Sequence, residues 1–424
     1  MSELNAVEKQ HKLDPDKNQM QDFEKSGDKI LVELFKERLR LHKKISTMDN
    51  GCRLKLKEVF LTIREKEDFI GSHFYSAPQV SANNVDFKSI ALPILSKNYH
   101  APYMNAESTP FEFKNGDIMI TKGISFTSAT ISEVVTPRAL FSHIVYIYVD
   151  PKTKKVFTME SYIGKGVEIF SIEEALRNEN ARITVLRMKD RKAADTAATW
   201  MYNKIKKSEA DNKPIAYDYQ LNFHDNSKLS CEEIAYDALK STSNGKIIIP
   251  ENPSIVDLKD EKLLDKIGIK KGALMMPGDM EIDSRFDLIL DWTDYRINRD
   301  SVRKDAIMGS IFYWINNHNY HIDETWKAIA ARIVWSTRYI PGLWNLMAKL
   351  SGVPVDYKKD VPAGAISAVE SIKGIGGKML EFLNLADEKH QRMSNRWMTS
   401  AELRMTLDNY IKSRPPEIYR DFHD

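Results

Sequence analysis

The chain has 424 residues, of which 42% are hydrophobic and 29% charged, a composition typical of a soluble globular protein. Its 62 Lys and Arg nearly balance its 60 Asp and Glu, which leaves a net charge of +2 and excludes the strongly basic balance of many nucleic-acid-binding proteins. We therefore expect no nucleic-acid partner. The length suggests two or three domains, or one domain with large additions.

The two cysteines, Cys52 and Cys231, are too few for a disulfide framework or a cysteine-rich metal site, and they fit a reducing compartment. The first 30 residues are polar, so no secretory signal is predicted. No apolar run reaches the roughly 18 residues of a membrane-spanning helix. These features predict a cytoplasmic protein, with export by a route that needs no signal peptide as the alternative.

In chain order, residues 1–28 are polar and are predicted to form a poorly ordered tail. Residues 29–72 carry two helical apolar patterns separated by "STMDNG", which predicts a helical hairpin. We expect a helical N-terminal extension over 29–109, in which Cys52 is a packing residue.

Residues 110–295 have the pattern of a mixed domain. "FSHIVYIYVD" is a continuous apolar run typical of a buried strand, and "PKTKK" turns it into a second strand, "VFTMESYI". Ser171 and Glu174 have the spacing of a capping box at the start of a short helix. Short strands with intervening helices predict the α+β class for this domain.

The remaining residues, 296–424, are predicted to be helical. Within them, residues 325–350 place three tryptophans beside Lys and Arg, a pattern that fits either a helix packed on the domain or a helix in peripheral contact with a membrane. The sequence does not indicate an oligomeric state.

The surroundings of Cys231 suggest a nucleophile. Ser230 and Glu233 form a predicted capping box, so Cys231 is the first residue of a helix, where unpaired N–H groups and the helix dipole stabilise a thiolate. The neighbouring Glu232 and Glu233 oppose this effect. A nucleophilic cysteine also needs a base, usually a histidine held by a third polar group.

His143 is the histidine that stands at the head of the apolar strand, where an imidazole without a partner would be costly. Glu160 lies on the strand expected to pair with it, and a suitable register would bring the two side chains together. The alternatives are a core histidine with both nitrogens satisfied and a surface-facing carboxylate. His224, in the loop before Cys231, is a competing base.

An ordered set of motifs carries a resemblance: Gly116-Asp117, Ser142-His143, Glu160, Tyr217-Asp218-Tyr219 and Cys231-Glu232-Glu233. Over residues 112–295 the chain resembles the circularly permuted papain-like hydrolases, in particular the YiiX-like amidase branch of the NlpC superfamily, which is related to lecithin:retinol acyltransferase. The resemblance implies a permuted papain-like domain, with an antiparallel sheet packed on the cysteine helix. The bulky Tyr146 and Tyr148 depart from the family pattern, and the Ser/Thr-rich segment 121–141 is expected to wall the cleft.

The residues and the resemblance together predict a cysteine hydrolase that cleaves an amide bond through an acyl-enzyme. Cys231 would attack, His143 would take the thiol proton and Glu160 would orient the ring. Substrate or oxyanion contacts are assigned to Tyr217, Ser230 and Asp117. No cofactor and no metal are expected.

Two alternative functions use the same residues or scaffold. One is a thiol-dependent lipase or acyltransferase acting on ester-linked lipids, and the other is a non-catalytic binding protein. The substrate is accordingly a small molecule, a peptide or a lipid.

Overall fold

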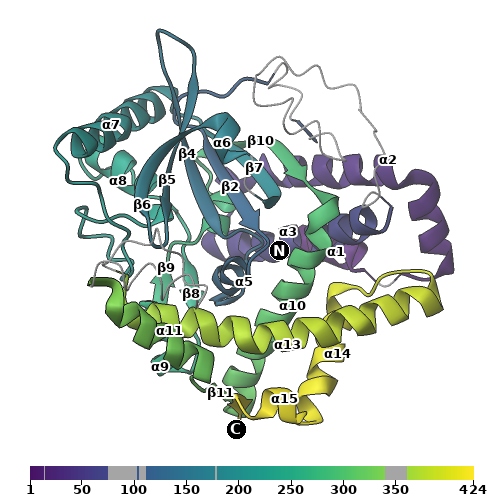
Figure 1. Cartoon of the computed structure of the whole chain (residues 1–424). Helices are drawn as coiled ribbons and strands as arrows, with labels where there is room; N and C mark the ends of the chain where they lie inside the picture. Colours follow the sequence, from purple (N-terminus) through teal and green to yellow (C-terminus); the bar gives the residue numbers. More distant parts are fainter. Residues whose placement is uncertain (14, 75–102, 105–110, 177–178, 340–360) are drawn as a thin grey trace.

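The computed structural model describes residues 1–13, 15–74, 103–104, 111–176, 179–339 and 361–424 (Figure 1). Its centre is a seven-stranded sheet with the order β1-β10-β7-β2-β4-β5-β6, in which every neighbouring pair is antiparallel. The strands are β1 (Tyr103–Met104), β2 (Ile118–Gly123), β4 (His143–Val149), β5 (Val156–Tyr162), β6 (Gly166–Ser171), β7 (Asn180–Met188) and β10 (Phe286–Thr293). The predicted α+β class, with an antiparallel sheet, is confirmed.

Two small sheets accompany the central one. One contains β3 (Val135–Thr136), β8 (Ser254–Val256) and β9 (Gly272–Leu274), and the other pairs β11 (His321–Ile322) with β12 (Phe422–His423). The β11–β12 pair joins the end of the chain to a segment about a hundred residues earlier.

One face of the central sheet packs on α7 (Arg191–Ala210) and α8 (Cys231–Thr242). The buried face of α7 is rich in alanine, including Ala194 and Ala197, so the helix can lie close to the large aromatic side chain of Tyr146. Helix α8 contributes Ile234 and Ala238 to the same core. This packing fixes the position of the residue at the start of α8.

The N-terminal helices cover the same face toward β7 and β10. They are α1 (Ser2–His11), α2 (Lys17–His42), the 3-10 turn η1 (Ile45–Thr47) and α3 (Asn50–Phe74). The prediction of a poorly ordered tail over 1–28 is wrong, because Leu4, Val7 and Phe23 are buried in a core shared with α3. Leu4 and Val7, three residues apart on one face of α1, pack this short polar helix on the larger α3, and Phe23 does the same for the start of α2.

A buried ionic network joins α2 and α3 to the sheet. Asp291 of β10 accepts hydrogen bonds from Arg38 of α2, at 2.5 Å, and from Arg64 of α3, at 3.1 Å. Other members of the network are Glu67, Asp68, Thr184, Arg182 and Glu281. Since the charged side chains are almost fully buried, each depends on its partners to offset the cost of leaving water.

Among the described residues of the C-terminal part, the elements are helices apart from the short strands β11 and β12. Its long helix α10 (Tyr295–His318) begins one residue before the predicted boundary and packs on α3, α5 (Phe126–Glu133), α13 (Ala363–Ser394) and α14 (Ser400–Lys412). Residues 75–102 and 105–109 of the predicted N-terminal extension lie outside the described residues, and Tyr103–Met104 joins the sheet as β1. Besides α7, α8 and the helices just named, the described residues after α3 form the helices α6 (Ile172–Ala175), α9 (Glu261–Ile267), η3 (Pro277–Ile282), α11 (Trp326–Ser336), η4 (Thr337–Tyr339) and α15 (Pro416–Tyr419).

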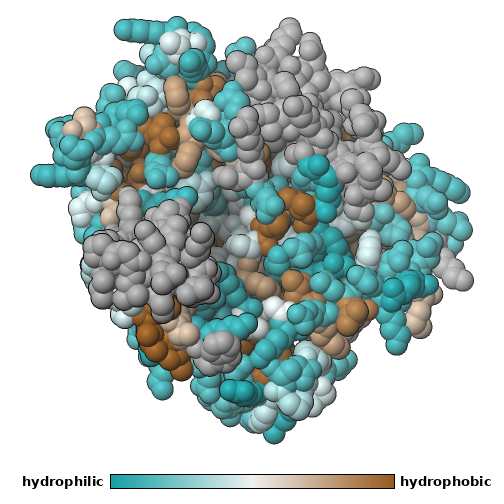
Figure 2. Space-filling view, in the orientation of Figure 1, coloured by the Kyte–Doolittle hydropathy of each residue, from teal (hydrophilic) through white to brown (hydrophobic). Residues whose placement is uncertain are grey.

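The predicted membrane-contact segment, 325–350, is described only as far as residue 339. Within it, Trp335 is fully buried between α11 and α13, and its indole N–H donates to the backbone oxygen of Val361 at 2.9 Å. Among the described residues, no helix is both long and apolar enough to cross a bilayer. The face in Figure 2 shows hydrophobic residues in small patches separated by hydrophilic ones.

Candidate active site

The structure brings His143 and Glu160 together. His143 is the first residue of β4, and Glu160 lies on β5, which pairs with β4 from Tyr146 opposite Met159. His143 Nε2 lies 3.0 Å from Glu160 Oε2. The register of this hairpin therefore brings the two side chains together, as we expected from the short turn between the strands.

Two further groups hold Glu160 in place. Its Oε1 accepts a hydrogen bond from Thr158 Oγ1 at 2.6 Å, and its Oε2 accepts one from the Tyr162 hydroxyl at 2.5 Å. The Tyr162 ring also stacks on the His143 ring, with centroids 4.9 Å apart. Burial favours the neutral acid, but hydrogen bonds from His143, Thr158 and Tyr162 outweigh it and lower the pKa of Glu160. Glu160 is therefore a carboxylate that fixes the orientation of the imidazole.

Cys231 is the first residue of α8 and is almost fully buried. The predicted capping box is present: the Ser230 N–H donates to Glu233 Oε2 at 2.7 Å. A hydrogen bond from the backbone of Ile144, the residue after His143, favours the thiolate of Cys231. The thiol thus lies beside the beginning of strand β4.

The helix N-terminus was expected to stabilise the thiolate of Cys231, but other effects on the pKa of this thiol are larger. Burial, followed by the charge of Glu232, raises the pKa of Cys231 well above its ordinary value, and the contact with Ile144 does not compensate. Burial also raises the pKa of Glu232, and that of Glu233 to about 8. The isolated thiol is therefore protonated near neutral pH, and any attack by sulfur requires removal of its proton.

Cys231, His143 and Tyr217 line one cavity of about 480 Å³. Ser125, Thr127 and Ser128 of the segment around α5 form one wall, as the sequence predicted for this Ser/Thr-rich connection. Residues of α13 form another wall, namely Ala365, Ile366, Val369, Glu370 and Lys373. The C-terminal helical part of the chain is thus a component of the cleft.

A second, largely apolar cavity of about 110 Å³ adjoins the first. Both are lined by Thr127, Ile131, Ile163, Tyr217, Ala365 and Val369. Most of the remaining lining of the second cavity is apolar, including Phe126, Leu221, Ile269, Leu274, Met276 and Ile372, and its other members are Thr130, Asp218, Tyr219 and Glu232. The cleft therefore has a polar part around Cys231 and an apolar arm that begins at Tyr217.

The three predicted substrate or oxyanion residues have different positions. Tyr217 lines both cavities, and burial, with the nearby Cys231, raises the pKa of its hydroxyl, which therefore stays protonated and can donate. Ser230 is a buried capping residue. Asp117 is not among the residues that line the cavity: it is fully buried and binds Arg187 through both oxygens, at 2.8 and 2.7 Å. The assignment of Asp117 to substrate binding is therefore wrong, because its carboxylate is used by Arg187. This partner lies 70 residues away and was not evident in the sequence.

The competing base, His224, is exposed and lines a different cavity with Phe223 and Tyr236. The sequence reasoning missed the contribution of α13 to the cleft. It also did not anticipate the contact between Ser128 and Ser142, whose hydroxyls lie 2.6 Å apart in the cavity that His143 lines. Apolar helical spacing marks the buried face of α13 but does not identify which cavity that face borders.

Comparisons with known proteins place few limits on this chain. No protein-family model matches it, and no curated protein matches it. Among solved structures it is similar to the crystal structure of the metalloprotein yiiX from Escherichia coli O157:H7, DUF1105, at 15% sequence identity and a TM-score of 0.32. The similarity covers 41% of this chain and 95% of that one.

Proposed function

We propose that this protein is a cysteine hydrolase with a permuted papain-like catalytic domain, in which Cys231, His143 and Glu160 form the catalytic triad. One observation carries the proposal: an imidazole oriented by a buried carboxylate shares a cavity with a cysteine at a helix N-terminus. A nucleophile, a base and a group that orients the base are the components of covalent acyl transfer. The retention of all three argues against the non-catalytic alternative.

The raised pKa of Cys231 determines how the first step proceeds. The thiol is neutral at rest, so His143 acts as a general base, and its other ring nitrogen, Nδ1, accepts the proton as sulfur attacks the substrate carbonyl. Glu160 stabilises the imidazolium that forms. This mechanism needs no preformed thiolate, unlike the thiolate stabilised by the helix N-terminus that the sequence suggested.

The remaining steps use groups at the start of α8. Its first backbone N–H groups and the hydroxyl of Tyr217, which lines the same cavity as Cys231, would stabilise the oxyanion of the tetrahedral intermediate. The intermediate collapses by breaking the bond to the leaving group, which takes the proton from His143 and departs as an amine or alcohol. Water, deprotonated by His143, then attacks the thioester and restores the thiol.

A chromogenic ester provides the test. Incubation with p-nitrophenyl acetate, followed by peptide mass spectrometry, should show an acetyl group on Cys231 and release of p-nitrophenolate. Cys231→Ala and His143→Ala should each abolish both signals, while the matched control Cys52→Ala, at the chain's other cysteine, should retain them. Unchanged hydrolysis in Cys231→Ala would overturn the proposal.

The apolar arm favours the second candidate, an enzyme that acts on acyl esters of lipids. Its walls can bury an acyl chain attached to the carbonyl that Cys231 attacks. Each buried methylene contributes about 0.8 kcal/mol, or roughly a four-fold gain in kcat/KM per methylene, until the arm is filled. We expect this increase across p-nitrophenyl esters from acetate to octanoate, and its loss in Val369→Lys. A flat profile would instead favour small amide substrates.

A further inference from the structure

A cluster of two histidines and one aspartate lies outside the cleft, where β11 meets β12. His321 and His423 are directly opposite each other in this antiparallel pair. Asp323 follows β11, and its backbone N–H donates to the backbone oxygen of Asp421 at 3.0 Å. Backbone pairing therefore brings together side chains that are about a hundred residues apart in the sequence.

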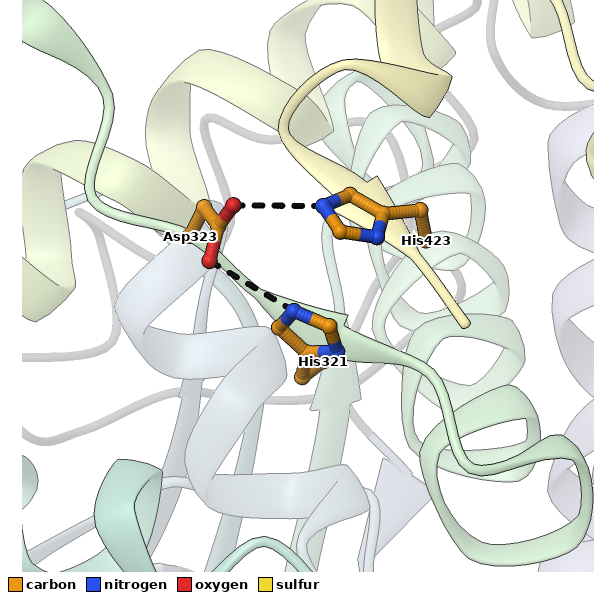
Figure 3. A group of neighbouring side chains, drawn as sticks. All are labelled: His321, Asp323 and His423. Carbon is orange, nitrogen blue, oxygen red and sulfur yellow. Dashed lines mark hydrogen bonds and ion pairs between the residues drawn. The ribbon is translucent and has the colours of Figure 1, made fainter.

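The donor atoms of the three side chains converge. Figure 3 shows both imidazole rings directed at the Asp323 carboxylate, with His423 Nε2 3.2 Å from Oδ2 and His321 Nε2 3.5 Å from Oδ1. One donor atom from each residue lies within 4.8 Å of the others. In a tetrahedral zinc site with bonds of about 2.0–2.1 Å, neighbouring ligand atoms are about 3.3–3.4 Å apart. Both nitrogen–oxygen separations are close to that value.

The contacts around His423 fix the orientation of its ring. Its Nδ1 lies 3.1 Å from the backbone oxygen of Asp424, and a hydrogen bond donated there leaves the Nε2 lone pair directed toward Asp323. On the opposite side of the strand pair, Phe422 is fully buried, and its ring packs on that of Tyr320, with centroids 5.0 Å apart. Since side chains alternate along a strand, burial of Phe422 and Tyr320 holds His423 and His321 at the surface.

From these contacts we propose that His321, Asp323 and His423 bind a divalent transition-metal ion, with zinc preferred. Two imidazoles and one carboxylate suit zinc and its neighbours in the first transition row, whereas magnesium and calcium prefer oxygen ligands. The three side chains are 46%, 53% and 28% exposed, so water can complete the coordination.

The bound metal would link β12 to β11 and so stabilise the pairing of these two strands. Lys378 of α13 pairs with Asp421 at 2.8 Å, so the metal-linked strands would also be tied to the helix that walls the cleft. The role inferred for the ion is structural, because none of its three ligands lines the cavity of Cys231.

The test is zinc binding to the full chain after treatment with chelator, measured by calorimetry in a Cys231→Ala background so that the thiol of the cleft does not compete. We expect one zinc ion per chain and a rise in Tm, with much weaker binding of magnesium. His423→Ala and Asp323→Asn should each weaken zinc binding at least ten-fold.

The matched control is His224→Ala, which removes an exposed histidine elsewhere and should leave binding unchanged. Circular dichroism checks that the variants are folded. Equal zinc affinity in His423→Ala, Asp323→Asn and the background would overturn the site, as would zinc binding no tighter than magnesium. Neither result would affect the acylation of Cys231 in the natural chain, so the two proposals are tested separately.

Discussion

Asp291→Asn should destabilise the fold strongly, although the substitution hardly changes side-chain volume. Asp291 is the carboxylate shared by Arg38 and Arg64, and all three side chains are almost fully buried. Removal of one partner from a buried ionic group costs about 3–5 kcal/mol, because the remaining charges are left without compensation. Since Glu67 and Glu281 still contact the arginines, we expect a loss of about 3 kcal/mol.

The loss of stability in Asp291→Asn should depend on pH in a definite direction. Burial favours the neutral acid, but Arg38 and Arg64 outweigh it and lower the pKa of Asp291 far below its ordinary value. The carboxylate therefore contributes its full stability above its unfolded pKa of about 3.9, and the contribution is lost as the pH falls further. The difference between natural chain and variant should be constant near neutral pH and shrink below about pH 4.

Urea unfolding followed by tryptophan fluorescence measures the difference, and Asp287→Asn is the matched control. Asp287 lies on the same strand, its side chain is 51% exposed, and its contact with Lys189 is 3.7 Å long. Loss of such a surface pair should cost less than about 1 kcal/mol. If the two variants lose the same stability, the network does not join the N-terminal helices to the sheet as we argue.

Two further changes test local features of the fold. Burial raises the pKa of Glu233 to about 8, so the folded chain retains a proton that the unfolded chain releases at lower pH, and stability should fall from about pH 4.5 to 8. Glu233→Gln should remove this decline in urea unfolding, and an identical trend in both proteins would contradict the assignment. Gly116→Ala should cost more than Gly245→Ala in thermal unfolding: both glycines have positive φ, but a Cβ at Gly116 would lie 2.6 Å from the Ala194 oxygen, whereas one at Gly245 meets nothing within 4 Å. Equal losses of stability in the two variants would show that the backbone at Ala194 can move away from the added Cβ without loss of stability.

The parts of the site that could be predicted from the sequence are those set by local rules. The short turn between β4 and β5 limits their register, so His143 and Glu160 could be paired from strand pattern alone. The capping box placed Cys231 at the start of α8 for a similar reason: its partners are three residues apart. The α+β class followed from the alternation of short strands and helices.

The features that the sequence did not disclose depend on contacts between distant segments. Asp117 was misassigned because the arginine that neutralises it lies on β7. The pKa of Cys231 was misjudged because its burial arises only when α8 packs on the sheet. The order of residues 1–28 was missed because the surface that receives Leu4 and Val7 belongs to another helix.

The position of α13 has a consequence for dividing this protein into fragments. The predicted catalytic domain ends at residue 295, yet Ala365, Ile366 and Val369 form one side of the cavity that Cys231 lines. A fragment trimmed at that boundary would keep the thiol, the imidazole and the carboxylate, but its binding site would be open to water on one flank. Under the hydrolase function that we propose, the activity of such a fragment would understate both the affinity and the selectivity of the full chain.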